Sequence, residues 1–284
     1  MRPVPRRHWL LLSLALLLTL GAARAAWADA GPVLEIVHQG QTRHYSRAEL
    51  LAHPALREIT VPADVAYQRP MRFRALPLTA LLPWLDTADS VQFVAGDGFA
   101  ATVPAPLLRG GPDTQAWLAV EPGAAPWPPL KPGGASAGPF YLVWTGAEKM
   151  GISPEQWPYQ ILRIADSQPL TGHFPQLLPQ GAPAPDQPSW RGLKVFATHC
   201  VACHQLNGGG DARLGPDLNR PFSPTEYFQE AYLRRLIRDP AQVRDWPQRH
   251  MPGFAPQVLP DADLDDLLAY LRQMAAQRPP AVAK

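Results

Sequence analysis

The chain has 284 residues, and its 26 basic and 24 acidic residues give a formal net charge of +2. Four arginines lie within the first 28 residues, so the rest of the chain carries 22 basic against 24 acidic residues. Because no basic tract remains, the charge pattern argues against a nucleic-acid partner. With 46% apolar residues the chain can bury sizeable cores, and its 35 prolines point to loops and a linker rather than to wholesale disorder.

The first residues have the order of a secretory signal peptide. A basic start is followed by an apolar run at residues 9–20 and by the small-residue site Ala26-Trp27-Ala28. Arg24 interrupts the apolar stretch, which is therefore short for a membrane span. We expect a signal peptide at 1–28, cleaved near Ala28, and a periplasmic protein without a stable membrane span. An uncleaved anchor is the alternative.

Residues 31–166 predict a domain that is α+β or mostly β. Gln39-Gly40-Gln41 and Gly96-Asp97-Gly98 each separate two short β-prone runs, which predicts two hairpins. Ser46 and Glu49 have the spacing of a capping box, which predicts a short helix to about Ala52. Further strands are expected at 116–121, 140–144 and 160–164, and a further helix at 78–85.

A proline-rich stretch follows, and then the pattern becomes helical. Residues 167–189 contain six prolines and are expected to form a semi-rigid linker. We expect one helix that begins with Ser189 as its N-cap and runs toward Cys200. Further helices are expected at 226–238 and, from apolar residues at helical spacing, at 261–277. These elements predict an all-α domain at 190–278.

The only two cysteines of the chain stand in Cys200-Val201-Ala202-Cys203-His204. On one helical turn each thiol can bond one haem vinyl group while the histidine lies under the iron, and C-x-x-C-H is the string of c-type haem attachment. We therefore expect one covalent haem c, attached at Cys200 and Cys203, with His204 as an axial ligand. A zinc site would need two more ligands, for which only His204 and His250 are available. A thioredoxin-like pair would need a βαβ setting, which the flanking pattern lacks.

The second axial ligand is expected at Met251. It stands in Arg249-His250-Met251-Pro252-Gly253-Phe254, and the proline biases the methionine toward an extended loop that can lay its sulfur on the haem. His/Met ligation raises the reduction potential. The alternatives are His250 or no protein ligand. Met274 falls on the core side of the last helix pattern, whereas Met71 and Met150 lie in the first domain.

Residues 189–277 resemble the class I cytochrome c family. The residues that carry the resemblance are Gly192, Phe196, Cys200, Cys203, His204, the Leu214-Gly215-Pro216-Asp217-Leu218 loop, Met251-Pro252, Tyr270 and Leu271. The resemblance implies that the Pro216 carbonyl accepts the free N–H of His204 and so orients its ring. It also implies that the first and last helices cross, with Gly192 and Phe196 near Tyr270.

Residues 31–166 resemble, more faintly, the molybdopterin-binding domain of sulfite oxidase-type enzymes. The carrying segments are Arg74-Ala75-Leu76-Pro77-Leu78, Gly96-Asp97-Gly98-Phe99, Trp117-Leu118-Ala119, residues 138–143 and Trp157 to Ile161. That family binds molybdenum through a cysteine thiolate, and this domain contains no cysteine. We therefore expect the fold without its metal and do not expect molybdopterin.

Several other side chains of the first domain allow either a functional or a purely structural interpretation. His38, His44 and His53 could suggest a metal site, although solvated histidines are the default. Tyr67, Arg69, Arg72 and Arg74 suggest either an anion-binding face or alternating residues on an exposed strand edge. Trp127, Trp144 and Trp157, with Pro128 and Pro129, could form a docking surface, but core and turn positions are expected for them. Trp84 and Trp117 are expected in the core.

The expected function is electron transfer by a single haem rather than enzymatic catalysis. The first domain would dock a redox partner, such as a periplasmic dehydrogenase, an oxidase or another cytochrome, or bind a ligand. One alternative is an oxidoreductase subunit with a cofactor in the first domain. Another is a haem-based redox sensor whose first domain responds to the state of the iron.

Overall fold

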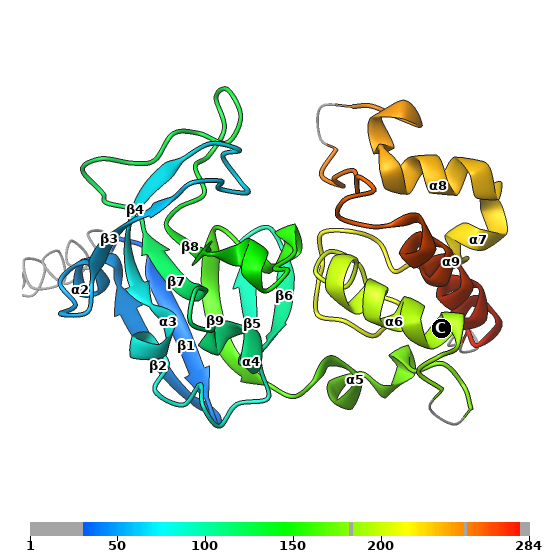
Figure 1. Ribbon diagram of the computed structural model, residues 1–284, viewed down its shortest axis with the longest axis horizontal. Helices are drawn as coiled ribbons and strands as arrows, with labels where there is room; N and C mark the ends of the chain where they lie inside the picture. Colours follow the sequence, from blue (N-terminus) through cyan, green and yellow to red (C-terminus); the bar gives the residue numbers. More distant parts are fainter. Residues whose placement is uncertain (1–30, 182–183, 247–248, 279–284) are drawn as a thin grey trace, which may run out of the picture.

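The computed structural model describes residues 31–181, 184–246 and 249–278, so the expected signal peptide lies outside the described residues. Figure 1 shows two bodies side by side, one built from sheets and one from helices. The chain passes from the first to the second through the segment that follows the last strand.

Two sheets form the N-terminal domain, as the mostly-β prediction requires. The larger has the order β2-β1-β9-β5-β6, and the smaller has the order β3-β4-β7-β8. Strands β1 and β9 are parallel, and the other neighbours are antiparallel. The bounds are β1 Val33–His38, β2 Gln41–Ser46, β3 Arg57–Val61, β4 Met71–Pro77, β5 Ser90–Ala95, β6 Ala100–Pro104, β7 Gln115–Val120, β8 Phe140–Thr145 and β9 Ile161–Ser167.

Local sequence accounts for several of these elements. Gln39 and Gly40 both have positive φ, which suits the two-residue turn of the expected β1–β2 hairpin. Ser46 caps helix α2 (Arg47–Leu51) with the expected capping box to Glu49. The remaining short helices of this domain are α3 Leu78–Leu81, α4 Ala105–Arg109, η1 Ala147–Lys149 and η2 Pro154–Gln156.

The predicted helix at 78–85 is too long by one turn. It ends at Leu81 because Pro83 biases the residue before it away from helical geometry, and Leu82 has φ −114° and ψ 80°. Along β4 the side chains alternate, with Met71, Phe73 and Ala75 buried and two arginines between them exposed. β4 pairs with β3 and with β7, so these two arginines lie on the exposed face of an inner strand and not on a strand edge.

Four helices form the C-terminal domain: α6 Pro188–His199, α7 Pro224–Tyr227, α8 Glu230–Arg238 and α9 Asp261–Ala276, with the 3₁₀ turn η4 Pro240–Gln242. The expected N-cap is wrong, since Gln187 occupies that position and Pro188 is the first helical residue. Proline is pre-set for that place, so the helix begins one residue earlier and Ser189 is buried inside it.

The single helix predicted at 226–238 is also wrong. Phe228 and Gln229 are extended and divide it into α7 and α8. Ser223 caps α7 with its own capping box to Glu226, so the first turn is specified separately from the second helix. The last helix was predicted within one residue of its observed end.

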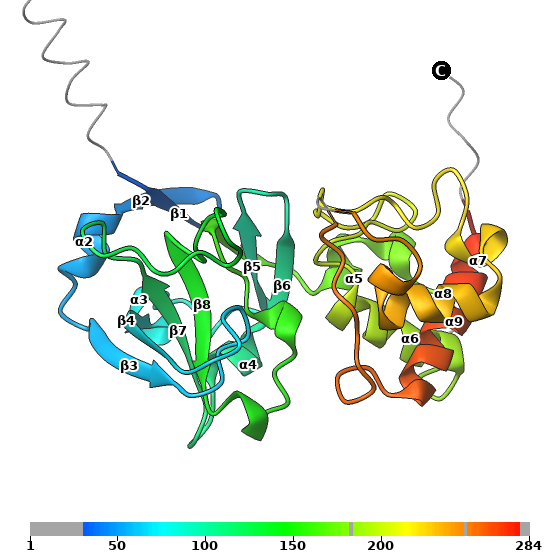
Figure 2. The ribbon, with the colours of Figure 1, turned by 90° about the horizontal axis from the view of Figure 1, so that it is seen from above.

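Helices α6 and α9 cross at close contact and lie side by side in both views (Figures 1 and 2). A Cβ on Gly192 would lie 2.0 Å from the Asp266 carbonyl oxygen and 2.6 Å from Tyr270 Cβ. The Phe196 and Tyr270 rings pack with centroids 5.6 Å apart. The expected crossing, with Gly192 and Phe196 near Tyr270, is confirmed.

The stretch expected as a linker, residues 167–189, has structure of its own in part. It holds α5 (Leu170–His173) and η3 (Pro175–Leu177). Leu177 is fully buried in the core of the C-terminal domain, and its carbonyl accepts a 2.7 Å hydrogen bond from the Tyr270 hydroxyl. The first part of this stretch is thus packed on the C-terminal domain.

The two domains meet at the β5–β6 hairpin, which lies on the face of the sheet domain nearest the helices (Figure 2). The Ala100 N–H donates to the Ala202 carbonyl at 2.9 Å, and the Arg213 N–H donates to the Gly98 carbonyl at 2.8 Å. Ala202 packs into the core of the sheet domain. The turn after α6 and the loop that follows it are therefore hydrogen-bonded to the β5–β6 hairpin at the edge of the larger sheet.

None of the helices in the described part of the chain combines the length and apolar character that crossing a membrane requires.

Candidate functional site

The Cys200–His204 segment forms a tight turn directly after α6. Cys200 is the C-cap of that helix, and its carbonyl accepts the N–H groups of Cys203 at 3.1 Å and of His204 at 2.9 Å. Both cysteines are free thiols. The turn thus brings two unbonded thiols and an imidazole together on consecutive positions.

Both thiols are held in the neutral form. Burial, followed by the charge of Glu155, raises the pKa of Cys203 to about 12, and the same causes raise the pKa of Cys200 further. A buried neutral thiol reacts slowly as a nucleophile or metal ligand, because the thiolate is the reactive form. This environment disfavours a redox-active dithiol.

The imidazole of His204 is oriented by the loop that follows it. Its Nδ1 lies 2.8 Å from the Pro216 carbonyl oxygen, which can only accept, so Nδ1 carries the proton and Nε2 is left with a free lone pair. Burial lowers the pKa of His204, while the Pro216 carbonyl opposes this shift. A neutral ring with a free Nε2 is the form in which histidine binds a metal.

Gly215 allows this close approach. A Cβ at Gly215 would lie 2.5 Å from Cε1 and 2.7 Å from Nδ1 of His204. The Gly215 N–H donates to the Cys203 carbonyl at 2.8 Å, and the Leu218 N–H donates to the Gln205 carbonyl at 2.8 Å. Two backbone hydrogen bonds therefore fix the loop against the turn that carries His204.

Met251 lies in an irregular segment between η4 and α9, as expected for a loop methionine. It is partly buried against the same apolar cluster that Cys200 and Leu218 contact. His250 beside it is exposed, and Met274 is buried in the core. The buried members of this cluster are Leu177, Leu193, Phe196, Val201, Leu206, Leu233, Ile237, Phe254, Leu259, Leu264, Leu267, Leu268, Tyr270, Leu271 and Met274.

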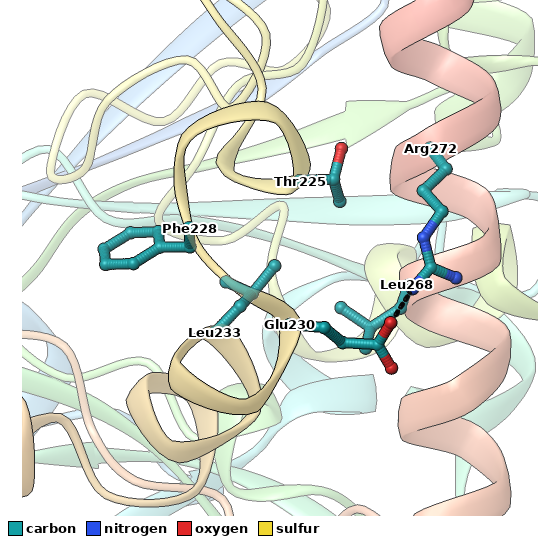
Figure 3. Close-up of a pocket in the computed structure, with 6 residues that line it drawn as sticks. All are labelled: Thr225, Phe228, Glu230, Leu233, Leu268 and Arg272. Carbon is teal, nitrogen blue, oxygen red and sulfur yellow. Dashed lines mark hydrogen bonds and ion pairs between the residues drawn. The ribbon is translucent and has the colours of Figure 1, made fainter.

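A small cavity of about 80 Å³ lies where α7, α8 and α9 meet (Figure 3). It is lined by Thr225, Phe228, Glu230, Leu233, Leu268 and Arg272, and an ion pair joins Glu230 to Arg272. Ligand pockets usually enclose about 300 Å³ or more. Because neither the cysteines, His204 nor Met251 line it, this cavity is a gap between helices and not the site.

The histidines of the sheet domain do not meet. In the β1–β2 register His44 lies opposite Glu35, and His38 lies opposite Gln41. His38 stacks on Trp84 at 4.6 Å instead. Among the described residues no group of three or more His, Cys, Asp or Glu side chains is arranged to hold a metal ion.

The tryptophans follow their core interpretation. Trp127, Trp144 and Trp157 are buried, while Trp84 and Trp117 are half-buried against the same core.

Sequence reasoning missed the contacts that seat the site against the sheet domain. His199 Nδ1 donates to Glu155 Oε2 at 2.9 Å, and both side chains are about one-tenth exposed. Gln92 Nε2 donates to Asp211 Oδ2 at 2.6 Å. These partners are far apart in sequence and belong to no motif, so no local signal could have paired them.

Comparison with known proteins bears on this arrangement. A family model described as cytochrome c matches residues 189–275. The cytochrome c of Chlamydomonas reinhardtii is 31% identical over 110 residues, which span 34% of this chain and 96% of that protein. The cytochrome c2 of Rhodoblastus acidophilus is 33% identical over 98 residues, which span 30% of this chain and 91% of that protein. The chain belongs to the cytochrome c family.

The C-terminal domain is therefore a class I cytochrome c domain, as predicted, and haem-based electron transfer to and from a redox partner is its function. Covalently bound haem c follows from the family. The local chemistry fits this group: two unpaired neutral thiols lie one turn apart, and the adjacent imidazole has a free Nε2. The matched residues lie outside the sheet domain, whose likeness to the sulfite oxidase type stays a prediction.

Proposed function

We propose that this protein is an exported, single-haem electron carrier whose haem is attached at Cys200 and Cys203 and ligated by His204 and Met251. The observation that carries the proposal is the contact between His204 Nδ1 and the Pro216 carbonyl, which leaves Nε2 free to bind a metal close in sequence to two free thiols. When bound, haem supplies one-electron exchange between Fe(III) and Fe(II). The single C-x-x-C-H string supports one haem per chain.

Met251 is the proposed sixth ligand. Of the other methionines in the described residues, Met71 and Met150 lie in the sheet domain and Met274 is fully buried in α9. Met251 is therefore the one methionine among them that lies in a loop of the C-terminal domain. If His204 and Met251 both held the iron, no position would remain open to a substrate, which supports a carrier rather than an enzyme. The basic and apolar leader at residues 1–28 supports export to the periplasm.

The sheet domain is proposed to act as a docking or ligand-binding module. Its β6 edge binds the turn that carries the cysteines, which supports a role close to the haem. A groove of about 260 Å³ lies over β3 and β4; it is smaller than the usual ligand pocket, so the ligand-binding version rests on its charged lining and not on its size. The groove is lined by Glu58, Arg72, Phe73, Arg74, Pro122, Ala125 and Trp127, so two of the expected anion-binding arginines belong to it.

Haem and metal analysis of the protein from a strain that matures c-type cytochromes tests this proposal. We expect one covalent haem per chain, no molybdenum, and in the ferric state the weak far-red absorption band of methionine-ligated haem. Met251→Ala should abolish that band, and His250→Ala should leave it intact. A wild-type spectrum without the band would refute the ligation, and one molybdenum per chain would favour an oxidoreductase subunit.

A further inference from the structure

The segment that carries Met251 has little structure of its own. Among its described residues, 249–260, there is no helix or strand, and the internal backbone bonds are two from Val258 and Leu259 to the Ala255 carbonyl. A loop of this kind fixes a side chain only if other parts of the protein hold its backbone. Two arginines provide such contacts.

Arg249 holds the loop at Met251 itself. Its Nη1 donates to the Met251 carbonyl at 3.0 Å, while its Nε donates to Asp245 Oδ1 at 3.2 Å. The guanidinium is thereby anchored on one edge and leaves another edge for the loop. Arg249 thus ties the backbone of Met251 to the segment that precedes it.

Arg238 holds the loop beyond Met251. From the last turn of α8 its Nη1 donates to the Phe254 carbonyl at 2.8 Å and to the Leu259 carbonyl at 2.5 Å. Its Nη2 donates to Asp261 Oδ1 at 2.6 Å, at the start of α9. The side chain is 19% exposed, so these bonds are partly shielded from water.

The backbone of α8 contacts the same part of the loop. The Phe254 N–H donates to the Ile237 carbonyl at 3.0 Å. A Cβ on Gly253 would lie 2.5 Å from the Arg238 carbonyl oxygen, so only glycine fits there without displacement. The loop therefore lies directly on the helix end from which Arg238 extends.

We propose that Arg238 and Arg249 are positioning residues that hold Met251 on the haem iron, an inference that rests on the proposed Met251 ligation. Both contact the loop backbone rather than the reacting atoms. Each joins two or more acceptors through different nitrogens of the planar guanidinium, whereas the donors of lysine share one nitrogen and cannot span acceptors placed that far apart. We call each arginine with its hydrogen bonds to the loop a clasp. Loss of either clasp lets the loop leave the iron more often, so that an external ligand competes better with Met251 for the iron.

Imidazole titration of the ferric holoprotein tests this inference. The variants are Arg238→Lys and Arg249→Lys, which keep the charge but lose the multiple hydrogen bonds. We expect imidazole to bind about tenfold more tightly in Arg238→Lys and about threefold more tightly in Arg249→Lys, since hydrogen bonds to charged groups are lost. The matched control is Arg235→Lys, on the same helix, where the guanidinium stacks on the exposed Tyr232 ring.

The possible outcomes distinguish the role of the two arginines from the Met251 ligation on which it rests. If the wild type lacks the far-red methionine band, both the ligation and the clasps are refuted. If the band is present and imidazole affinity is equal in all three lysine variants, only the clasps are refuted. A purely structural role would lower the unfolding midpoint without changing imidazole affinity, which also counts against the proposal. Should Arg238→Lys not fold, the more exposed Arg249→Lys decides alone.

Discussion

His204 and Pro216 are joined by a 2.8 Å hydrogen bond from the imidazole Nδ1–H to the prolyl carbonyl. A proline carbonyl belongs to a residue whose φ is fixed by its ring, so the acceptor sits on a stiff part of the chain. The bond selects the tautomer of His204 and leaves Nε2 as the metal-binding atom. The imidazole has room to make this hydrogen bond only because the residue before the proline is Gly215.

Gly215→Ala should therefore weaken the site. The added methyl would lie 2.5 Å from Cε1 of His204, so the ring must turn away from Pro216. We expect a loss of about 1–3 kcal/mol in the free energy of unfolding, the usual cost of overpacking. Guanidinium denaturation followed at the haem absorbance measures it.

The matched control for this change is Gly172→Ala in α5, where a Cβ meets only Gln168 Oε1 at 3.8 Å. We expect that variant to be as stable as the wild type or slightly more so, because alanine is the better helix former. Equal stability of the two alanine variants would show that a methyl group at position 215 does not crowd the His204 ring.

Gly192→Ala should separate α6 from α9. The new methyl would overlap the Asp266 carbonyl at 2.0 Å and Tyr270 Cβ at 2.6 Å, and both belong to a packed helix. We expect a net loss of about 3 kcal/mol, although alanine by itself favours a helix over glycine by about 1 kcal/mol. Denaturation measured by circular dichroism checks this, with Lys194→Ala on the exposed side of α6 as the control. A Gly192→Ala protein with wild-type stability would contradict the close crossing.

The sequence predicted features whose causes are local. The β1–β2 turn at Gln39-Gly40, the capping box of Ser46 and Glu49, and the start of α9 depend on neighbouring residues, and each lies where expected. The Cys200–His204 motif likewise specifies its chemistry within five positions. For the C-terminal domain the motif and the helical periodicity together sufficed to assign the fold class.

Features set by distant contacts were not predicted. The division of α7 from α8 was missed because neither Phe228 nor Gln229 is a proline or glycine, and the packing of the partly buried Phe228 against the core is a tertiary effect. The start of α6 was missed because Ser189 has the side chain typical of an N-cap, whereas Pro188 before it occupies the first helical position. The contact of the Cys200–His204 turn with the sheet domain joins residues about 100 positions apart in the sequence. Hydrophobic periodicity does not indicate contacts of this kind.

Glu155→Leu should loosen the two domains from one another. It leaves the His199 imidazole without its 2.9 Å partner in a place where both side chains are about one-tenth exposed. Leaving a buried hydrogen-bonding group without its partner costs about 1–3 kcal/mol, and here that cost falls on the contact between domains. Small-angle scattering should show a larger radius of gyration.

Glu155→Gln is the informative companion, because its amide oxygen still accepts from His199 Nδ1–H and should preserve most of the docking. Glu148→Leu, on the exposed turn η1, controls for the added apolar side chain. If Glu155→Leu scatters like the wild type, the backbone bonds of Ala100 and Arg213 hold the domains together without the pair.

Asp64→Asn should stabilise the sheet domain, and more so as the pH rises. The Asp64 side chain is 2% exposed, and burial raises its pKa against the opposing bonds from the Tyr67 N–H at 2.8 Å and the Tyr141 hydroxyl at 3.4 Å. The folded chain thus keeps this proton to higher pH than the unfolded chain. Its stability falls as the pH rises from the ordinary range of an aspartate through the raised pKa. Asparagine removes that fall while its oxygen still accepts from Tyr67.

Denaturation followed by tryptophan fluorescence at about pH 4, 5.5 and 7 measures this difference, since these values span the ordinary aspartate pKa and the range above it. The gain of Asp64→Asn over the wild type should be smallest at the lowest pH and largest at the highest. Asp86→Asn removes the same charge from an exposed position and should show no such trend. A gain that shrinks with rising pH would mean that the Asp64 carboxylate is stabilised by its two donors more than burial penalises it.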